Sequence, residues 1–148
     1  MPRKEQEPER GKYSKVTNKS IEIISIHHVA IICSDYKKSK KFYTEILGLK
    51  PINETFRKEK NSYKLDMQIG DNIQIELFSF PNPPQRLTEP ESCGLRHLAF
   101  KVKNVELAKK ELETKGVEVE DIRRDQLTDK KYTFFKDPDG LPLELYQE

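Results

Sequence analysis

The sequence has few of the features that mark several large classes of protein. Its 148 residues include only two cysteines, Cys33 and Cys93, which do not form a CxxC pair. A disulfide framework is therefore excluded and a reducing compartment is indicated. No run approaches 18 apolar residues, and the first 20 residues lack the apolar centre of a signal peptide. We expect a cytoplasmic protein that makes no contact with a membrane.

A large net charge is also missing. Lysine and arginine number 27, aspartate and glutamate number 25, and the formal net charge is +2. Nucleic-acid-binding domains usually carry a strong basic excess, so nucleic acid is not an expected partner. Residues 1–20 contain six basic and three acidic side chains but few apolar ones. Because such a segment cannot bury much apolar surface, we predict that residues 1–20 form a charged, disordered N-terminal extension.

Residues 21–148 are predicted to form a single domain that begins with a strand, a helix and further strands. β-Branched residues predict a strand near 24–32. Asp35 is suited to cap a helix that Gly48 ends. Two short strands are expected at 63–70 and 72–80, joined by a turn at Gly70.

The same order returns after the proline-rich stretch FPNPPQRLTEPE. A strand is expected at 94–102 and an amphipathic helix at 105–115, ended by Gly116. Strands are then predicted at 116–123, 131–136 and 141–147, and the turn sequence DPDG joins the last two.

The two halves match at a nearly constant offset. HVAIICSD begins 69 residues before HLAFKVKN, and IQIEL begins 68 residues before LPLEL. A fixed offset between similar segments indicates a duplicated supersecondary unit. We predict an α+β fold of two tandem βαβββ modules: module one at about 24–80, a proline-rich linker at 81–91, and module two at about 94–147.

Four residues occupy equivalent positions in the repeat. His28 corresponds to His97 in the first strands, and Glu76 corresponds to Glu144 in the last strands. Each glutamate taken alone is explained by the polar outer face of a half-buried strand. Two imidazoles and two carboxylates at matched positions instead indicate a binding site for a divalent metal ion, because their charges sum to zero with such an ion.

This donor set is suited to zinc, nickel or cobalt, with iron or manganese as alternatives. Four protein ligands in an octahedral shell leave two positions for water or for substrate oxygens. Such an ion polarises a carbonyl group, and a glutamate can then abstract the neighbouring proton. Glu144 is the first candidate for this general base, and Glu76 is the second.

Four segments resemble the vicinal oxygen chelate superfamily, and within it the glyoxalase I-like, YaeR-type branch. They are IHHVAIICSDYKKSKKFYTEILGL, NIQIELFSF, CGLRHLAF and FFKDPDGLPLELYQ, and the resemblance covers about residues 24–147. The resemblance implies a curved, cup-like mixed sheet and a homodimer, with the metal site built either within one chain or across the interface. It also implies that the metal ligands are the four residues already singled out, namely His28, Glu76, His97 and Glu144.

By this resemblance the protein is expected to be a metal-dependent lyase or isomerase of the lactoylglutathione lyase type. Such an enzyme acts on a small hydroxycarbonyl compound or thiol adduct, and its metal stabilises an enediolate. In glyoxalase I an arginine and an asparagine help to bind glutathione, but Ile32 and Phe80 occupy those positions here. Apolar side chains cannot form these hydrogen bonds, so the resemblance leaves the thiol open.

Three alternatives come from the same superfamily. A ring-cleaving dioxygenase and an antibiotic thiol transferase each use three protein ligands, so Glu76 would be surplus in both. A metal-free small-molecule-binding protein of the bleomycin-resistance type would need none of the four residues as a ligand. Two further interpretations concern neighbouring side chains: His27 is predicted to point to the opposite sheet face from His28, and the aromatic residues at 132, 134 and 135 are predicted to lie in the core.

Overall fold

The computed structural model describes residues 21–148, so the predicted extension at residues 1–20 lies outside the described part of the chain. The first half contains β1 (His28–Cys33), α1 (Tyr36–Lys41), the π-helical turn η1 (Phe42–Ile46), β2 (Lys50–Arg57), the short helix η2 (Lys58–Lys60), β3 (Ser62–Ile69) and β4 (Ile73–Ser79). The second half contains β5 (Leu98–Val102), α2 (Val105–Thr114), β6 (Arg123–Arg124), β7 (Lys131–Lys136) and β8 (Pro142–Gln147).

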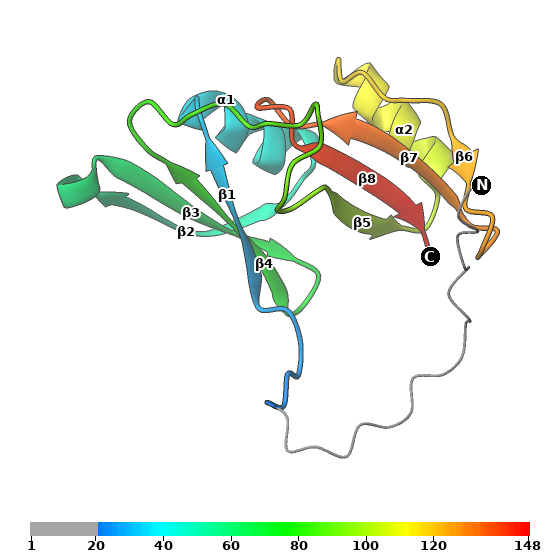
Figure 1. Cartoon of the computed structure of the whole chain (residues 1–148), viewed down its shortest axis with the longest axis horizontal. Coiled ribbons are helices and arrows are strands. Elements are labelled where there is room, and N and C mark those ends of the chain that lie inside the picture. The colour runs from blue at the N-terminus through cyan, green and yellow to red at the C-terminus, as the bar shows by residue number, and fades with distance from the viewer. Residues whose placement is uncertain (1–20) are drawn as a thin grey trace, which may run out of the picture.

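The strands form two four-stranded sheets with the same connectivity. Their orders are β1-β4-β3-β2 and β5-β8-β7-β6. In each sheet the first strand is parallel to the last strand of its module, and the remaining pairs are antiparallel. Figure 1 shows the two sheets next to each other, with α1 and α2 packed beside them. The α+β class and the tandem βαβββ modules are therefore confirmed.

Local signals place the helices where the sequence predicts them. The Asp35 carboxylate accepts a hydrogen bond from the backbone N–H of Lys38 at 3.0 Å and begins α1. Asn104 caps α2 in the same way, accepting from the N–H of Leu107 at 2.8 Å. The first helix is α-helical only as far as Lys41. It continues as the π-helical turn η1 and ends before Gly48, which has φ +74°.

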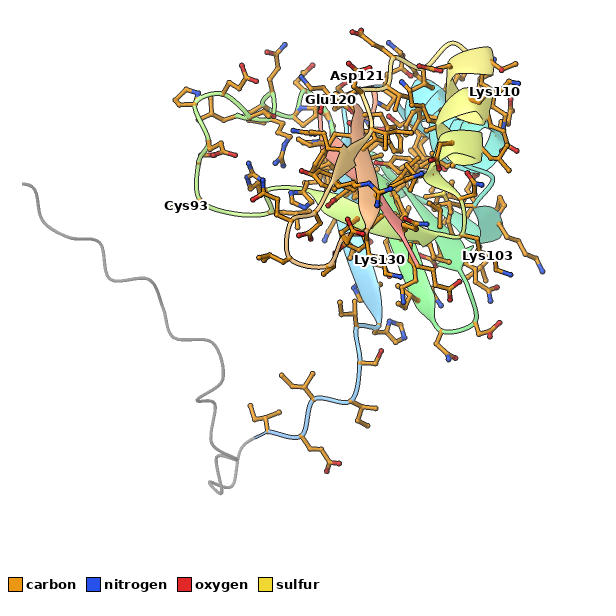
Figure 2. All side chains as sticks on the ribbon, turned by 90° about the vertical axis from the view of Figure 1, so that its right-hand side faces the viewer. Cys93, Lys103, Lys110, Glu120, Asp121 and Lys130 are labelled. Atoms are coloured by element: carbon orange, nitrogen blue, oxygen red, sulfur yellow. The ribbon has the colours of Figure 1, made fainter. Side chains whose placement is uncertain are left out.

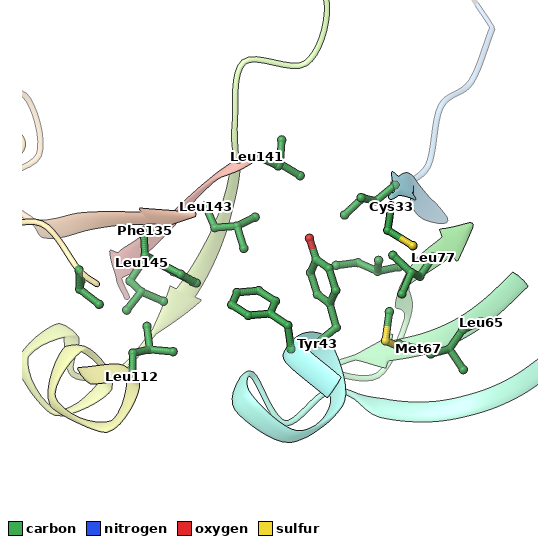
Figure 3. Packing of buried hydrophobic residues seen from close by; sticks show 14 residues of the cluster. Cys33, Tyr43, Leu65, Met67, Leu77, Leu112, Phe135, Leu141, Leu143 and Leu145 are labelled. Carbon is green, nitrogen blue, oxygen red and sulfur yellow. The ribbon is translucent and has the colours of Figure 1, made fainter. Parts of the chain in front are cut away.

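One hydrophobic core joins the two modules. It contains Ile31 and Met67 from the first sheet, Leu143 and Phe135 from the second, and Tyr43 from η1. Figure 3 shows Tyr43 between side chains of the two sheets. Since neighbours along a strand face opposite sides, the core occupies one face of each sheet and leaves the other face open.

The Tyr43 side chain also makes the main buried polar contact between the modules. Its hydroxyl donates a hydrogen bond to Oδ2 of Asp137 at 2.8 Å. The Oδ1 atom of Asp137 accepts from the backbone N–H groups of Asp139 and Leu141, both at 2.9 Å. Burial raises the pKa of Asp137, and burial together with the nearby Asp137 carboxylate raises the pKa of Tyr43.

One strand was missed by the sequence analysis, and two predicted strands are corrected. The strand at 50–57 was not predicted, because it is an exposed, polar edge strand that contains Pro51 and an irregular register after it. The strand predicted at 116–123 is reduced to an isolated bridge at Val119 and the two residues of β6. The first strand begins at His28 rather than near residue 24, because residues before it have no continuous pairing partner along β4.

Residues 21–27 therefore form an extended segment that leaves the folded body (Figures 1 and 2). Four isoleucines in this segment are largely exposed: Ile21 by 89%, Ile23 by 83%, Ile24 by 92% and Ile26 by 61%. So many uncovered β-branched side chains are unusual at a protein surface and indicate a surface that associates with another molecule. Within residues 21–148, no helix is both long and apolar enough to cross a membrane.

Candidate metal centre

The first predicted ligand pair lies on the open face of the first sheet. In β1 the side chains of Ile31 and Cys33 are buried, so the alternating position of His28 faces the other way. In β4 the same alternation buries Ile75 and Leu77 and turns Glu76 to the open face. The parallel pairing of β1 with β4 then brings His28 Nε2 to 3.5 Å from Glu76 Oε2.

A lysine on the neighbouring strand holds the other oxygen of Glu76. Lys64 Nζ lies 2.9 Å from Glu76 Oε1 and 3.1 Å from Asp66 Oδ1. The hydrogen bonds from Lys64 to these two carboxylates raise its pKa, and the bond to Glu76 has the larger effect. Glu76 is thereby fixed in place, with Oε2 facing the imidazole of His28.

The second pair has a similar arrangement at the second sheet, but His97 directly precedes β5, because the strand predicted at 94–102 begins only at Leu98. His97 Nε2 lies 3.0 Å from Glu144 Oε2. The ring of Phe134 meets the His97 ring edge to face, with centroids 5.1 Å apart. Glu144 is only 8% exposed, and among residues 21–148 no lysine or arginine lies within ion-pair distance of it; its near neighbour is the imidazole of His97. A buried carboxylate with so little compensation is unusual and indicates a further charged partner.

The spacing within each pair fits a shared metal ion. Metal–nitrogen and metal–oxygen bonds of about 2.0–2.2 Å, with angles from a right angle to tetrahedral, place two ligand atoms about 3.0–3.5 Å apart. The distances of 3.0 and 3.5 Å fall in this range. In addition, Nδ1 of His97 is buried without a hydrogen-bond partner in the described chain. Both pairs are thus suitable as halves of a metal site.

The two pairs do not meet within one chain. Among residues 21–148, no three histidine, cysteine, aspartate or glutamate side chains converge closely enough to hold a metal ion. The reason is the packing of the core: the core faces of the two sheets meet around Tyr43, so their open faces are not directed at each other. Each chain therefore presents two separate histidine–glutamate pairs, one at each sheet, and each pair is a candidate half-site.

Comparison with known proteins identifies the family. The model of the Glyoxalase/Bleomycin resistance protein/Dioxygenase superfamily matches residues 25–145. The chain belongs to this superfamily. Members of the superfamily bind small molecules, commonly bind a divalent metal ion and often form dimers.

Several relatives are similar over most of the chain. The uncharacterized protein YwkD of Bacillus subtilis is 60% identical over 124 residues, covering 84% of this chain and 97% of that protein. The uncharacterized protein YaeR of Escherichia coli is 51% identical over 123 residues, covering 83% and 95%. The crystal structure of the glyoxalase family protein from Enterococcus faecalis has a TM-score of 0.78 at 49% identity, covering 83% of this chain and 97% of that chain.

A more distant relative carries the name of an enzyme. The lactoylglutathione lyase of Schizosaccharomyces pombe is 29% identical over 148 residues, which cover 83% of this chain and 47% of that protein. The two relatives at 60% and 51% identity thus carry names without an activity, whereas this relative named for an enzyme is more remote.

His27 does not lie where the sequence predicts it. Its Nδ1 atom is 2.9 Å from Nδ1 of His28, and the two rings meet edge to face. Strand alternation does not separate them, because His27 precedes the first residue of β1. His27 therefore contacts the predicted ligand His28 instead of lying on the opposite face from it.

The aromatic residues near the second pair are also partly reassigned. Phe135 lies in the core, as predicted, but Tyr132 and Phe134 are only half-buried and lie on the same face of the sheet as Glu144. A cavity of about 1140 Å³ next to this pair is lined by side chains that include His97, Tyr132 and Phe134. The cavity is large enough for a small organic molecule beside His97.

Two basic residues on the first sheet were missed by sequence reasoning, Lys64 and Arg57. Lys64 contacts Glu76 directly. Arg57 lies with its guanidinium carbon 4.8 Å from the ring centre of Phe78. The signal for Lys64 was its alternation with Asp66 in a strand of buried apolar residues, which places both side chains on the open face. No comparable signal marks Arg57, since it is the last residue of an edge strand.

Proposed function

We propose that this protein is a metal-dependent lyase or isomerase of the glyoxalase I type. The observation that carries the proposal is the pair of matched half-sites, one histidine and one glutamate on each sheet, at 3.5 and 3.0 Å. The S. pombe relative named lactoylglutathione lyase adds support from the family. The substrate would be a small hydroxycarbonyl compound or a thiol adduct of one. Zinc, nickel or cobalt best suits the donor set, with iron or manganese as alternatives.

The complete site would be assembled by two chains. Because the half-sites of one chain do not meet, the His28–Glu76 pair of one protomer would face the His97–Glu144 pair of its partner. Two-fold symmetry would then give two equivalent four-ligand sites per homodimer. The exposed isoleucines of residues 21–27 support association, since a second chain can bury them.

The two glutamates would have different roles. Glu76 is held by Lys64 and is suited to remain a fixed ligand. Glu144 has no such anchor and is the better candidate for the general base, which abstracts a proton from the carbon next to the substrate carbonyl. When bound, the metal ion supplies electrostatic stabilisation of the negative charge that develops on the substrate oxygens. Glu144 would then return the proton to the neighbouring carbon, which completes an isomerisation.

The departures from glyoxalase I bear on the thiol. Ile32 is 56% exposed on the open face, and Phe80 stacks on Phe78 with ring centroids 6.2 Å apart. Neither side chain can bind the carboxylate of a γ-glutamyl group. We therefore propose that glutathione is not the preferred thiol. We also propose a cytoplasmic location, because Cys33 and Cys93 are both free thiols, the latter at the surface (Figure 2).

The test is the metal content of the full-length protein, purified without a metal-affinity tag and measured by elemental mass spectrometry. Wild type is expected to carry about one transition-metal ion per chain. The variant Glu76→Ala/Glu144→Ala is expected to carry almost none. A matched control is Glu91→Ala/Glu113→Ala, which removes two exposed glutamates from surface ion pairs and should leave the metal content unchanged.

Activity would then be assayed with hemithioacetals formed from methylglyoxal and several thiols. Isomerase activity that follows the metal content of these variants would support the proposal. Wild-type protein that takes up no metal even after addition of nickel or zinc would contradict it, and would favour the metal-free small-molecule-binding alternative.

A further inference from the structure

Arg57 is the arginine whose charge is least compensated in the described part of the chain. Residues 21–148 contain five arginines. Arg96, Arg123 and Arg124 each form an ion pair with a carboxylate, and Arg86 donates to backbone carbonyls. Arg57 has neither kind of partner among the described residues.

The surroundings of Arg57 hold its guanidinium in one orientation. Its Cζ atom lies 4.8 Å from the ring centre of Phe78 and 5.4 Å from that of Phe80. The two rings are stacked at an interplanar angle of 11°. One amino group, Nη2, donates to the hydroxyl of Ser62 at 2.6 Å. Cation–π contacts and this hydrogen bond orient the group without neutralising its charge.

One donor of Arg57 lacks any partner. Nε is buried and has no hydrogen-bond acceptor among the described residues. A buried N–H group without an acceptor lowers the stability of the fold, and the penalty is larger when the group carries a permanent positive charge, as a guanidinium does. Nη1 likewise has no hydrogen-bond partner among the described residues, but it is not buried. An anionic group at this accessible edge of the guanidinium would compensate the charge, since carboxylates and phosphates match the arginine fork.

Arg57 lies on the same open face as the first half-site. Phe78 and Glu76 are separated by one intervening residue of β4, so both side chains point to the open face, about 7 Å apart along the strand. Lys64 is paired with Phe78 in the ladder and reaches back to Glu76. His28, Glu76, Phe78 and Arg57 thus follow one another across this face.

We propose that Arg57 binds an anionic group of the substrate, a carboxylate or a phosphate, located a few carbon atoms from the reacting carbonyl. This inference rests on the proposed function, because it takes the His28–Glu76 pair as the reacting end of the site. It narrows the substrate class to small hydroxycarbonyl compounds that carry an acid group. The acid group would take the place of the glutathione contacts that Ile32 and Phe80 cannot make.

Arg123 provides a matched control within the same chain. Its guanidinium also lies over two aromatic rings, 5.2 Å from the centre of Tyr132 and 5.6 Å from that of Phe134. The difference is that its Nη2 is 2.8 Å from Oε2 of Glu120, which neutralises the charge. The rings of Tyr132 and Phe134 meet edge to face, whereas those of Phe78 and Phe80 are stacked. The substitutions Arg57→Met and Arg123→Met therefore each remove a guanidinium from contact with two aromatic rings, but only the first removes a charge without an acid partner.

The experiment is isothermal titration calorimetry on metal-free, full-length protein, with inorganic phosphate and malonate as separate probes. Wild type is expected to bind at least one of the probes, and the better-bound probe indicates whether the acid group is a phosphate or a carboxylate. Arg57→Met should weaken that binding at least tenfold, whereas Arg123→Met should change it less than twofold. Arg57→Gln serves the same purpose if the methionine variant does not fold. No binding to wild type, equal binding to the Arg57 variants, or an equal loss in Arg123→Met would overturn the proposal.

The metal content of Arg57→Met separates this inference from the proposed function. After reloading with zinc, the variant should contain as much metal as wild type, because Arg57 does not contact the ligand pair. Unchanged metal content together with unchanged anion binding would overturn the role of Arg57 alone. Absence of metal from wild type would overturn the proposed function, while the anion titration, made without metal, would still report on Arg57.

Discussion

Mixing two inactive variants tests whether the metal site is shared between chains. The first variant, His28→Ala/Glu76→Ala, lacks the first half-site. The second, His97→Ala/Glu144→Ala, lacks the second half-site. If a site combines one half from each chain, a dimer of either variant alone has only two of the four ligands at each site and should bind metal weakly.

The heterodimer gives a different result. One of its two sites receives the intact half from each chain, and the other receives neither. The expected content is about one metal ion per heterodimer, against about two for a wild-type dimer. In an unfractionated mixture with random pairing, about half of the dimers are mixed, so about a quarter of all sites are intact.

The assay uses co-expression of the two variants with different tags that contain no histidine, followed by purification on each tag in turn. Elemental mass spectrometry and the hemithioacetal assay are then applied to the same heterodimer. The shared site would be refuted if the heterodimer had as little metal and activity as the two variant homodimers while the wild-type dimer contained metal. It would require instead that the two half-sites of one chain meet, against the packing around Tyr43.

Three further outcomes are expected. Tyr43→Phe removes the hydroxyl that donates a hydrogen bond to the buried Asp137, and it should lower the free energy of unfolding by about 2 kcal/mol at pH 7. The pKa of Asp137 is raised, so its carboxyl becomes neutral in the folded state as the pH falls through that pKa, and the loss of stability should then become smaller. Urea unfolding curves that give the same loss at every pH would contradict this. His27→Ala should weaken metal binding by less than about tenfold, because His27 only orients the ring of His28, and a competition titration with a chelator would measure it. Asn104→Ala should cost about 1 kcal/mol through loss of the helix cap, seen as a lower thermal midpoint with unchanged metal content.

Much of this fold could be predicted because its signals are local or repeated. Asp35 caps a helix by accepting a hydrogen bond from the backbone N–H of Lys38, only three residues along the chain, and Gly48 supplies the positive φ that follows the helix. The nearly constant offset between the halves predicted that the first strands of the two modules are equivalent, and the ladders of β1 with β4 and of β5 with β8 confirm this, although His97 lies one residue before β5 whereas His28 is the first residue of β1. The edge strand at 50–57 was not predicted, because nearly all of its side chains are exposed and no alternation of buried and exposed positions is imposed on its sequence.

The sequence by itself determined which histidine and glutamate come together on each sheet, because strand alternation and duplication are properties of short segments. Only the tertiary structure decided that the halves stay apart in one chain, since that depends on how the two sheets pack around Tyr43. It also decided that Lys64 holds Glu76 while Glu144 stays unanchored, and that Arg57 is stacked without an acid partner. These contacts join residues on different strands, and their register and packing cannot be derived from any one segment.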